Sequence, residues 1–263
     1  MSVFVIAEAG KAWLTHEGIT IEECLHNARI LALAAKYCSA DCVKFQCHVF
    51  EDEQFKRDDS RHEWIKLNEK LTPFNEFWLP LKEYCDMIGV EFLCTPMSTI
   101  AAVKINLLVK RWKVASPDIN DWDLLEYLVS TEKEIIISAG MSTLEERSQA
   151  ADFLDDRTDY LMLHCVSEYP TPLERMAMYQ IENYSGLSDH SMSLITGAMA
   201  VTLGARVIEK HFTVDGWGRD AHMSLNPEQL KTYISNIREA EKAMTSVELP
   251  TKKEMELRKL FKV

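Results

Sequence analysis

The chain has 263 residues, of which 47% are hydrophobic and 27% charged, so it is long enough to bury the core of one large globular domain. Acidic residues outnumber basic ones by 41 to 29, and a formal charge of −12 argues against nucleic acid as a partner, because phosphate-backbone binders are basic. The chain shows no signal-peptide pattern and no run of the roughly 20 apolar residues that a membrane span needs.

The seven cysteines are odd in number, lie among apolar residues and include no C-x-x-C spacing. This pattern favours free thiols in a reducing compartment over a disulfide framework or a zinc site. We therefore expect a cytoplasmic protein.

Short runs rich in β-branched and apolar residues recur along the chain and predict strands. In chain order they are VFVIAE (3–8), DCVKFQC (41–47), VEFLC (90–94), RWKVAS (111–116), EIIISA (134–139), YLMLHC (160–165), YSGLS (184–188) and ARVIEKHF (205–212). Most are followed by apolar residues at helical spacing, over 20–37, 71–87, 124–129, 144–154, 195–203 and 230–244.

Four of these helices are expected to begin near a capping residue. Thr20 and Ser142 each stand three positions before a Glu, and Thr72 and Asn226 each directly precede a Pro. The charged segment Glu51–Lys70 is expected to form a long loop over one end of the fold.

Strands that are apolar on both faces and alternate with helices indicate an α/β protein with a parallel sheet. A closed (β/α)8 TIM barrel and an open doubly wound sheet both fit this order. The strand count and the length favour the barrel, and no glycine-rich dinucleotide motif follows the first strand. We expect a single barrel domain over residues 1–245 and a short helical tail over 246–263.

In such a barrel the active site lies at the carboxyl ends of the strands. Lys44 and Lys113 lie there within apolar sequence, where an unpaired ammonium group is costly. The same strand ends carry small hydroxyl residues: Thr95, Ser116, Ser138 and Ser188. Ammonium and hydroxyl groups together suit a phosphate or a carboxylate. Pairing of each lysine with Glu8 or Glu209 is the alternative interpretation.

His190 and His211 end neighbouring predicted strands, so their imidazoles can reach one point. Two imidazoles with further positions open to water suit a divalent metal ion. The alternative is that each is a hydrogen-bonded core histidine, which is also the interpretation of His164.

Several of these strand-end motifs together resemble the catalytic barrel of the sialic acid synthase family, which includes N-acetylneuraminate synthase and relatives making legionaminic and pseudaminic acids. The motifs are VKFQ (43–46), FLCTP (92–96), KVASPD (113–118), IISAGMS (136–142), LHCVSEYPTP (163–172), GLSDHS (186–191) and VIEKHFT (207–213). The match runs from about residue 3 to residue 244, in family order.

The resemblance implies that phosphoenolpyruvate condenses with an N-acetylated amino-sugar aldehyde to give a nine-carbon 3-deoxy-2-ulosonic acid and phosphate. It implies that His190 and His211 hold Mn²⁺ or Mg²⁺, which polarises the aldehyde. Phosphoenolpyruvate would bind the lysines and hydroxyl residues named above.

The resemblance also assigns roles to other polar residues. Gln46, Tyr169 and Asp220 match positions that line the sugar site, and Glu8, Asp118 or Asp220 would assist proton transfer. Family members pair as dimers, so the resemblance implies a homodimer.

Some positions depart from the family pattern. The loop after the first strand reads KAWLTHEG (11–18), and Arg219-Asp220-Ala221 replaces a Pro-Asp-His sequence. Glu168 stands where many members have Asn, and its carboxylate would repel a bound anion unless it is protonated or turned away. Nor do we expect the C-terminal antifreeze-like domain of the family in this chain. Three explanations are open: this domain is a separate chain, the substrate differs, or Glu51–Lys70 serves as the lid.

Two other functions remain open from the sequence. One is a metal-dependent aldolase or lyase that acts on a keto sugar acid. The other is a non-catalytic sugar-binding partner in glycan biosynthesis, although such a protein has no need of metal ligands.

Overall fold

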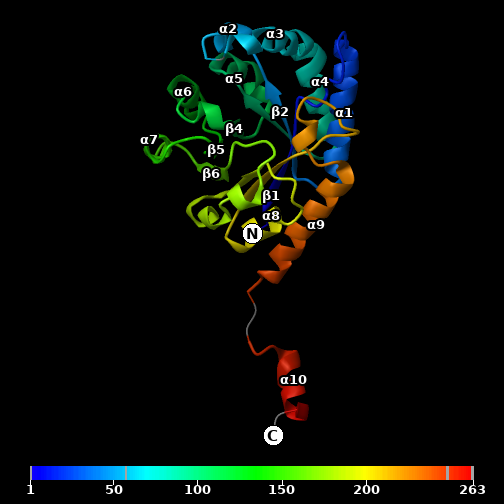
Figure 1. Ribbon diagram of the computed structural model, residues 1–263, viewed down its shortest axis with the longest axis vertical. Helices are drawn as coiled ribbons and strands as arrows, with labels where there is room; N and C mark the ends of the chain where they lie inside the picture. The colour runs from blue at the N-terminus through cyan, green and yellow to red at the C-terminus, as the bar shows by residue number, and fades with distance from the viewer. Residues whose placement is uncertain (1, 57, 247–248, 262–263) are drawn as a thin grey trace.

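A barrel of eight parallel strands forms the body of the molecule in the computed structural model, which describes residues 2–56, 58–246 and 249–261 (Figure 1). The strands are β1 (Phe4–Gly10), β2 (Cys42–Cys47), β3 (Glu91–Pro96), β4 (Trp112–Val114), β5 (Ile135–Ser138), β6 (Tyr160–Cys165), β7 (Gly186–Asp189) and β8 (Val207–His211). Their pairing order is β3-β2-β1-β8-β7-β6-β5-β4, and β3 lies beside β4. The predicted (β/α)8 barrel is confirmed.

Helices connect the strands and cover the outside of the barrel (Figure 1). They are α1 (Ile21–Tyr37), α2 (Phe50–Glu53), α3 (His62–Leu71), α4 (Leu79–Ile88), α5 (Thr99–Ile105), α6 (Trp122–Ser130), α7 (Leu144–Leu154), α8 (Thr196–Thr202), α9 (Pro227–Ala243) and α10 (Lys252–Phe261). None of these described helices combines the length and apolar content of a membrane span. Helix α10 stands apart from the barrel and buries none of its residues.

The helix caps agree with the sequence at two of the four expected positions. Thr20 and Asn226 are the N-caps of α1 and α9, and each forms a full capping box. Helix α7 spans the expected residues, but its N-cap is Thr143 and not Ser142, because the Ser142 hydroxyl donates instead to the Ala139 carbonyl at 2.6 Å. Thr72 ends α3 rather than starting a helix, since its hydroxyl donates to the carbonyl of Asn68.

The segment Glu51–Lys70, expected to be a loop, is largely helical, so that expectation was wrong. It contains α2, a 3₁₀ turn over Asp59–Arg61 and most of α3. Helix α3 buries Ile65, Asn68 and Leu71 along one side, so its few apolar residues suffice to dock it. Helix α5 was not expected at all, because its buried side is short and rich in alanine.

The barrel interior is divided into an apolar layer and a polar layer. The apolar layer consists of inward-facing residues early in the strands: Ile6, Cys42, Leu93, Ile136, Leu163 and Val207. Since side chains alternate between the two faces of a strand, the residues two positions further along also point inward. On β1, β2 and β8 these residues are Glu8, Lys44 and Glu209. The alternation therefore places buried polar side chains at the carboxyl end of the barrel.

Gly186 is required for close pairing of β7 with β8. A Cβ atom at this position would lie 1.9 Å from the carbonyl oxygen of Val207, which is part of the backbone and cannot rotate away. We predict that Gly186→Ala lowers the free energy of unfolding by about 3 kcal/mol, as measured by urea denaturation.

Gly216→Ala is the matched control for this substitution. Gly216 has a positive φ of 71°, but no atom lies within 4 Å of the place that a Cβ atom would take there, so only backbone strain of about 1 kcal/mol is expected. Equal losses in the two variants would contradict the steric explanation.

Candidate functional site

A cavity of about 380 Å³ opens at the carboxyl ends of the strands. We call it the inner cavity. Among the residues that line it are almost all of those singled out from the sequence: Glu8, Lys44, Gln46, Thr95, Lys113, Ser116, Ser138, Tyr169, Ser188, His190, His211 and Asp220. Asp118 is the exception, because the 3₁₀ turn Ser116–Asp118 buries it away from the cavity lining.

Four buried charges form the floor of the inner cavity. Lys44 Nζ lies 2.7 Å from Glu8 Oε2 and 3.6 Å from Glu209 Oε2. Lys113 Nζ lies 3.8 Å from the same Glu209 oxygen. Both lysines are therefore paired with carboxylates, as the alternative interpretation held, and both still line the cavity. The two interpretations of the lysines are compatible.

The hydroxyl residues of the floor orient this charge cluster. Lys44 Nζ donates to Thr95 Oγ1 at 3.0 Å, and Lys113 Nζ donates to Ser138 Oγ at 2.7 Å. Ser188 Oγ donates to Glu209 Oε1 at 2.9 Å. Each of these contacts joins two different strands, so the hydroxyl groups fix where the charged atoms point.

Burial and neighbouring charges shift the pKa values of the four groups in different directions. Burial raises the pKa of Glu8 and lowers the pKa of Lys113. For Lys44, the carboxylates of Glu209 and Glu8 outweigh the effect of burial and raise the pKa. For Glu209, burial alone would raise the pKa, but Lys113 and Lys44 lower it to about 2. Glu209 is thus the fixed anion of the floor, and Glu8 is the carboxyl group that binds a proton more readily.

Glu8 lies next to the polar residues of two other segments. Gln46 Nε2 donates to Glu8 Oε1 at 2.6 Å. A Cβ atom at Gly10 would lie 3.2 Å from Glu8 Oε1 and 3.7 Å from Asp220 Oδ2, so the missing side chain of Gly10 leaves room for both carboxyl groups. The structure therefore brings Glu8, Gln46 and Asp220 to one side of the cavity.

The two histidines face each other across the end of β7 and β8. Their ring centroids are 5.3 Å apart, and the Tyr169 ring lies 4.3 Å from that of His190. His190 Nδ1 lies 2.8 Å from the carbonyl oxygen of Val166, which can only accept, so Nδ1 carries the proton and Nε2 keeps its lone pair. Burial and the neighbouring His190 keep the pKa of His211 well below its usual range, so its ring is neutral.

This donor set fits a divalent metal ion held by two protein ligands. A metal-ligating histidine typically donates its other ring N–H to a carbonyl or carboxylate, as His190 does here. No cluster of three or more potential His, Cys, Asp or Glu ligands occurs in the described part of the chain. The site therefore suits a catalytic ion with positions open to water or substrate, and not a closed structural site.

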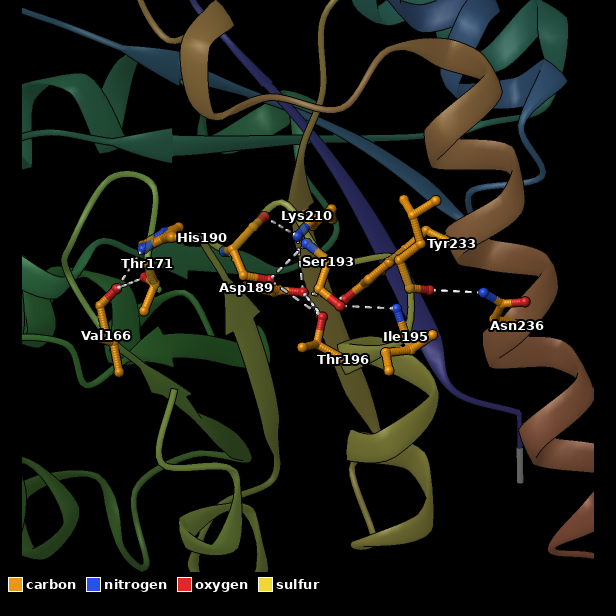
Figure 2. Close-up of polar contacts among 12 residues, drawn as sticks. Val166, Thr171, Asp189, His190, Ser193, Ile195, Thr196, Lys210, Tyr233 and Asn236 are labelled. Atoms are coloured by element: carbon orange, nitrogen blue, oxygen red, sulfur yellow. Dashed lines mark hydrogen bonds and ion pairs between the residues drawn. The ribbon is translucent and has the colours of Figure 1, made fainter. Parts of the chain in front are cut away.

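The residues that precede the two histidines form a buried ion pair on the outer side of the strands (Figure 2). Asp189 Oδ2 lies 3.0 Å from Lys210 Nζ, and neither side chain is exposed to solvent. The same carboxylate accepts from Thr196 of α8, from Tyr233 of α9 and from the backbone N–H of Ser191. This network ties β7 and β8 to the helices behind them, so it fixes the backbone that carries both imidazoles.

Glu168 does not reach the floor of the inner cavity. Its carboxylate lies 2.7 Å from Arg175 Nη2 and belongs to the lining of a separate cavity. His164 also lies outside the inner cavity lining, where its Nε2 bonds the carbonyl of Met176 at 2.8 Å. The repulsion expected from the sequence is avoided because Glu168 is turned away.

The inner cavity also has lining residues that were not selected from the sequence. These include Lys11, Arg61 and His222. Glu209, which the sequence offered as a partner of the lysines, lines the cavity as well. No sequence pattern gave a signal for Arg61, which comes from the segment expected to be a loop.

Comparisons with known proteins agree on one family. The NeuB family profile matches residues 31–248. An uncharacterized protein of Methanocaldococcus jannaschii is 36% identical over 257 residues, which cover 93% of this chain and 73% of that protein. The N,N'-diacetyllegionaminic acid synthase of Legionella pneumophila is 32% identical, and the match covers 100% of this chain and 79% of that protein. The crystal structure of N-acetylneuraminic acid (sialic acid) synthetase from Leptospira borgpetersenii, in complex with citrate, has a TM-score of 0.84 and 27% sequence identity. The match covers 99% of this chain and 93% of that one.

The buried pair of Asp189 and Lys210 generates a stability prediction. Lys210→Met removes the cation and leaves a buried carboxylate without it, so we expect a loss of about 3–5 kcal/mol in the free energy of unfolding. Lys82→Met is the control, because it breaks an ion pair with Asp86 on the partly exposed surface of α4 and should cost at most about 0.5 kcal/mol. Chemical denaturation measures both, and similar losses would contradict a special role for the buried pair.

Proposed function

Because the chain belongs to the NeuB family of sialic-acid-type synthases, we propose that it condenses phosphoenolpyruvate with the open-chain aldehyde of an N-acetylated amino sugar. The products are a nine-carbon 3-deoxy-2-ulosonic acid and phosphate. One observation carries the proposal: an anion-binding floor and a pair of imidazoles line the same cavity.

The floor is suited to hold a small phosphorylated acid. Lys113 has a carboxylate oxygen only at 3.8 Å, so its ammonium group is the less fully paired of the two lysines. The hydroxyl groups of Ser116 and Ser138 line the same cavity and are able to donate to phosphate or carboxylate oxygens. Ser188 also lines it, and its hydroxyl donates to Glu209. These donors are fixed before substrate enters, which lowers the cost of binding.

In the proposed reaction, C3 of phosphoenolpyruvate attacks the aldehyde carbon, and the new C–C bond leaves positive charge at C2. Water adds at C2, and the tetrahedral intermediate expels phosphate by cleavage of its C–O bond. Glu8 suits the transfer of a proton to the aldehyde oxygen, because burial raises its pKa and favours its protonated form. Asp220 lines the cavity on the same side and is the second candidate, whereas Asp118 is not positioned to reach substrate.

His190 and His211 are the residues that would hold Mn²⁺ or Mg²⁺. When bound, the ion supplies Lewis-acid polarisation of the aldehyde. The chain's own contribution is to orient both rings, through the Val166 carbonyl that accepts from His190 Nδ1 and through the Asp189–Lys210 network behind them.

We also propose a cytoplasmic location. All seven cysteines are unpaired and buried in the structure. Free thiols persist in a reducing compartment, which agrees with synthesis of a sugar acid from phosphoenolpyruvate.

The direct test is phosphate release from phosphoenolpyruvate with Mn²⁺ and a panel of N-acetylated hexosamines. We expect at least one sugar to support turnover, EDTA to stop it, and His211→Ala to lower it by at least about 10²-fold, because only one imidazole then remains. His26→Ala, on the exposed surface of α1, is the control and should leave the rate unchanged. Phosphate release that needs no sugar would refute the proposal that the protein is a synthase. Cleavage of a keto sugar acid without phosphoenolpyruvate would also refute it.

A second prediction concerns the floor. Lys113→Met keeps the length of the side chain but removes its charge, so phosphoenolpyruvate should bind at least about tenfold more weakly in calorimetry. Lys110→Met, an exposed position that precedes the same strand, should leave the affinity unchanged. If Lys113→Met bound phosphoenolpyruvate with unchanged affinity, the floor of the inner cavity would not be part of the phosphoenolpyruvate site.

A further inference from the structure

A second and larger cavity, of about 790 Å³, adjoins the inner cavity. We call it the outer chamber. Lys11, Arg61 and Asp220 line both cavities, so the two are continuous through these residues. The reaction proposed above uses the inner cavity only, which leaves the outer chamber without a role.

The outer chamber is built by three connections that are far apart in the sequence. Lys11 follows β1, Arg61 and Trp64 come from the segment between β2 and α4, and Arg219 follows β8. Trp64 brings the cations together, since Lys11 Nζ lies 4.0 Å and Arg219 Cζ 5.9 Å from its ring centroid.

The cations of the outer chamber lack close carboxylate partners. In the part of the chain that the structure describes, no ion pair is found for Lys11, Arg61 or Arg219. Two carboxylates, Glu17 and Asp220, also line the chamber, so cations are in excess there although the whole chain carries −12. Burial lowers the pKa of Lys11 to about 8, which is the effect of an ammonium group that has lost water without gaining a close anion.

We propose that the outer chamber binds an anionic group carried by the acceptor sugar, at the end remote from its aldehyde. The inference rests on the proposed function, because the aldehyde has to reach the imidazole pair in the inner cavity. The rest of the sugar then passes between Lys11, Arg61 and Asp220 into the outer chamber. There Trp64 offers an apolar face, and the guanidinium groups of Arg61 and Arg219 suit the oxygens of a phosphate monoester or a carboxylate.

Sugar binding in the absence of turnover tests the inference. Calorimetry with EDTA and saturating phosphoenolpyruvate, which occupies the inner lysines, compares N-acetylmannosamine and N-acetylglucosamine with their 6-phosphates and their 6-carboxylates. We expect an anionic form to bind at least about tenfold more tightly than the neutral sugar. Comparison of the sugar 6-phosphates with the 6-carboxylates identifies which anionic group the protein recognises.

Variants locate the preference in the outer chamber. Arg61→Gln combined with Arg219→Gln should reduce the affinity for the anionic sugar to that of the neutral sugar, measured with the same double variant. Arg157→Gln is the matched control, because Arg157 is an exposed arginine that also lies over an aromatic ring, 4.3 Å from the Phe153 centroid, and is far from both cavities in the loop before β6. Its affinities should equal those of the unchanged protein.

Equal binding of neutral and anionic sugars would overturn the inference, as would a preference that survives in the double variant. Either result leaves the proposed function standing if a neutral sugar supports phosphate release. If no sugar supports phosphate release, the proposed function fails, and the binding preference still decides the role of the outer chamber.

Discussion

The structure depends on a cluster of four charges enclosed inside the barrel. Glu8, Lys44, Lys113 and Glu209 are all less than 5% exposed, and each lysine lies within 3.8 Å of a carboxyl oxygen. Loss of one partner from such a cluster leaves an uncompensated buried charge, which costs several kcal/mol. Substitution of any one of the four residues therefore destabilises the other three. The residues proposed to bind phosphoenolpyruvate are thus also needed for the stability of the barrel.

The alternation of side chains along β7 and β8 separates two roles. His190 and His211 point into the barrel and line the inner cavity, whereas Asp189 and Lys210 point outward and bind each other beneath α8 and α9. One face of each strand thus supplies chemistry and the other supplies rigidity. A shift of register by one residue would exchange the two faces, and the fully buried ion pair opposes such a shift.

Much of the barrel and of the inner cavity was predictable from the sequence. Apolar runs identified the strands, and the ends of parallel strands converge in space, so Lys44, Ser138 and His211 were expected to meet. Local hydrogen bonds decided details such as the cap of α7, where the sequence allows both Ser142 and Thr143 to pair with a glutamate three residues later. Asp118 is hidden by a tight turn after β4.

The outer chamber lay beyond prediction for a different reason. Its walls come from three connections whose relative placement depends on the whole fold, and one of them was expected to be a loop. The charge pattern within each segment does not show that the three segments meet around Trp64.

The division between strands and connections has an evolutionary consequence. The inner cavity is built largely on strands, which share their hydrogen bonds with neighbours on both sides, whereas the outer chamber is built on segments that join them. Insertions and substitutions in connecting segments are tolerated far better than changes within a barrel wall. Under the proposed assignment of the two cavities, descendants of this chain would be free to diversify the compound they elongate while the donor that they consume stays constant.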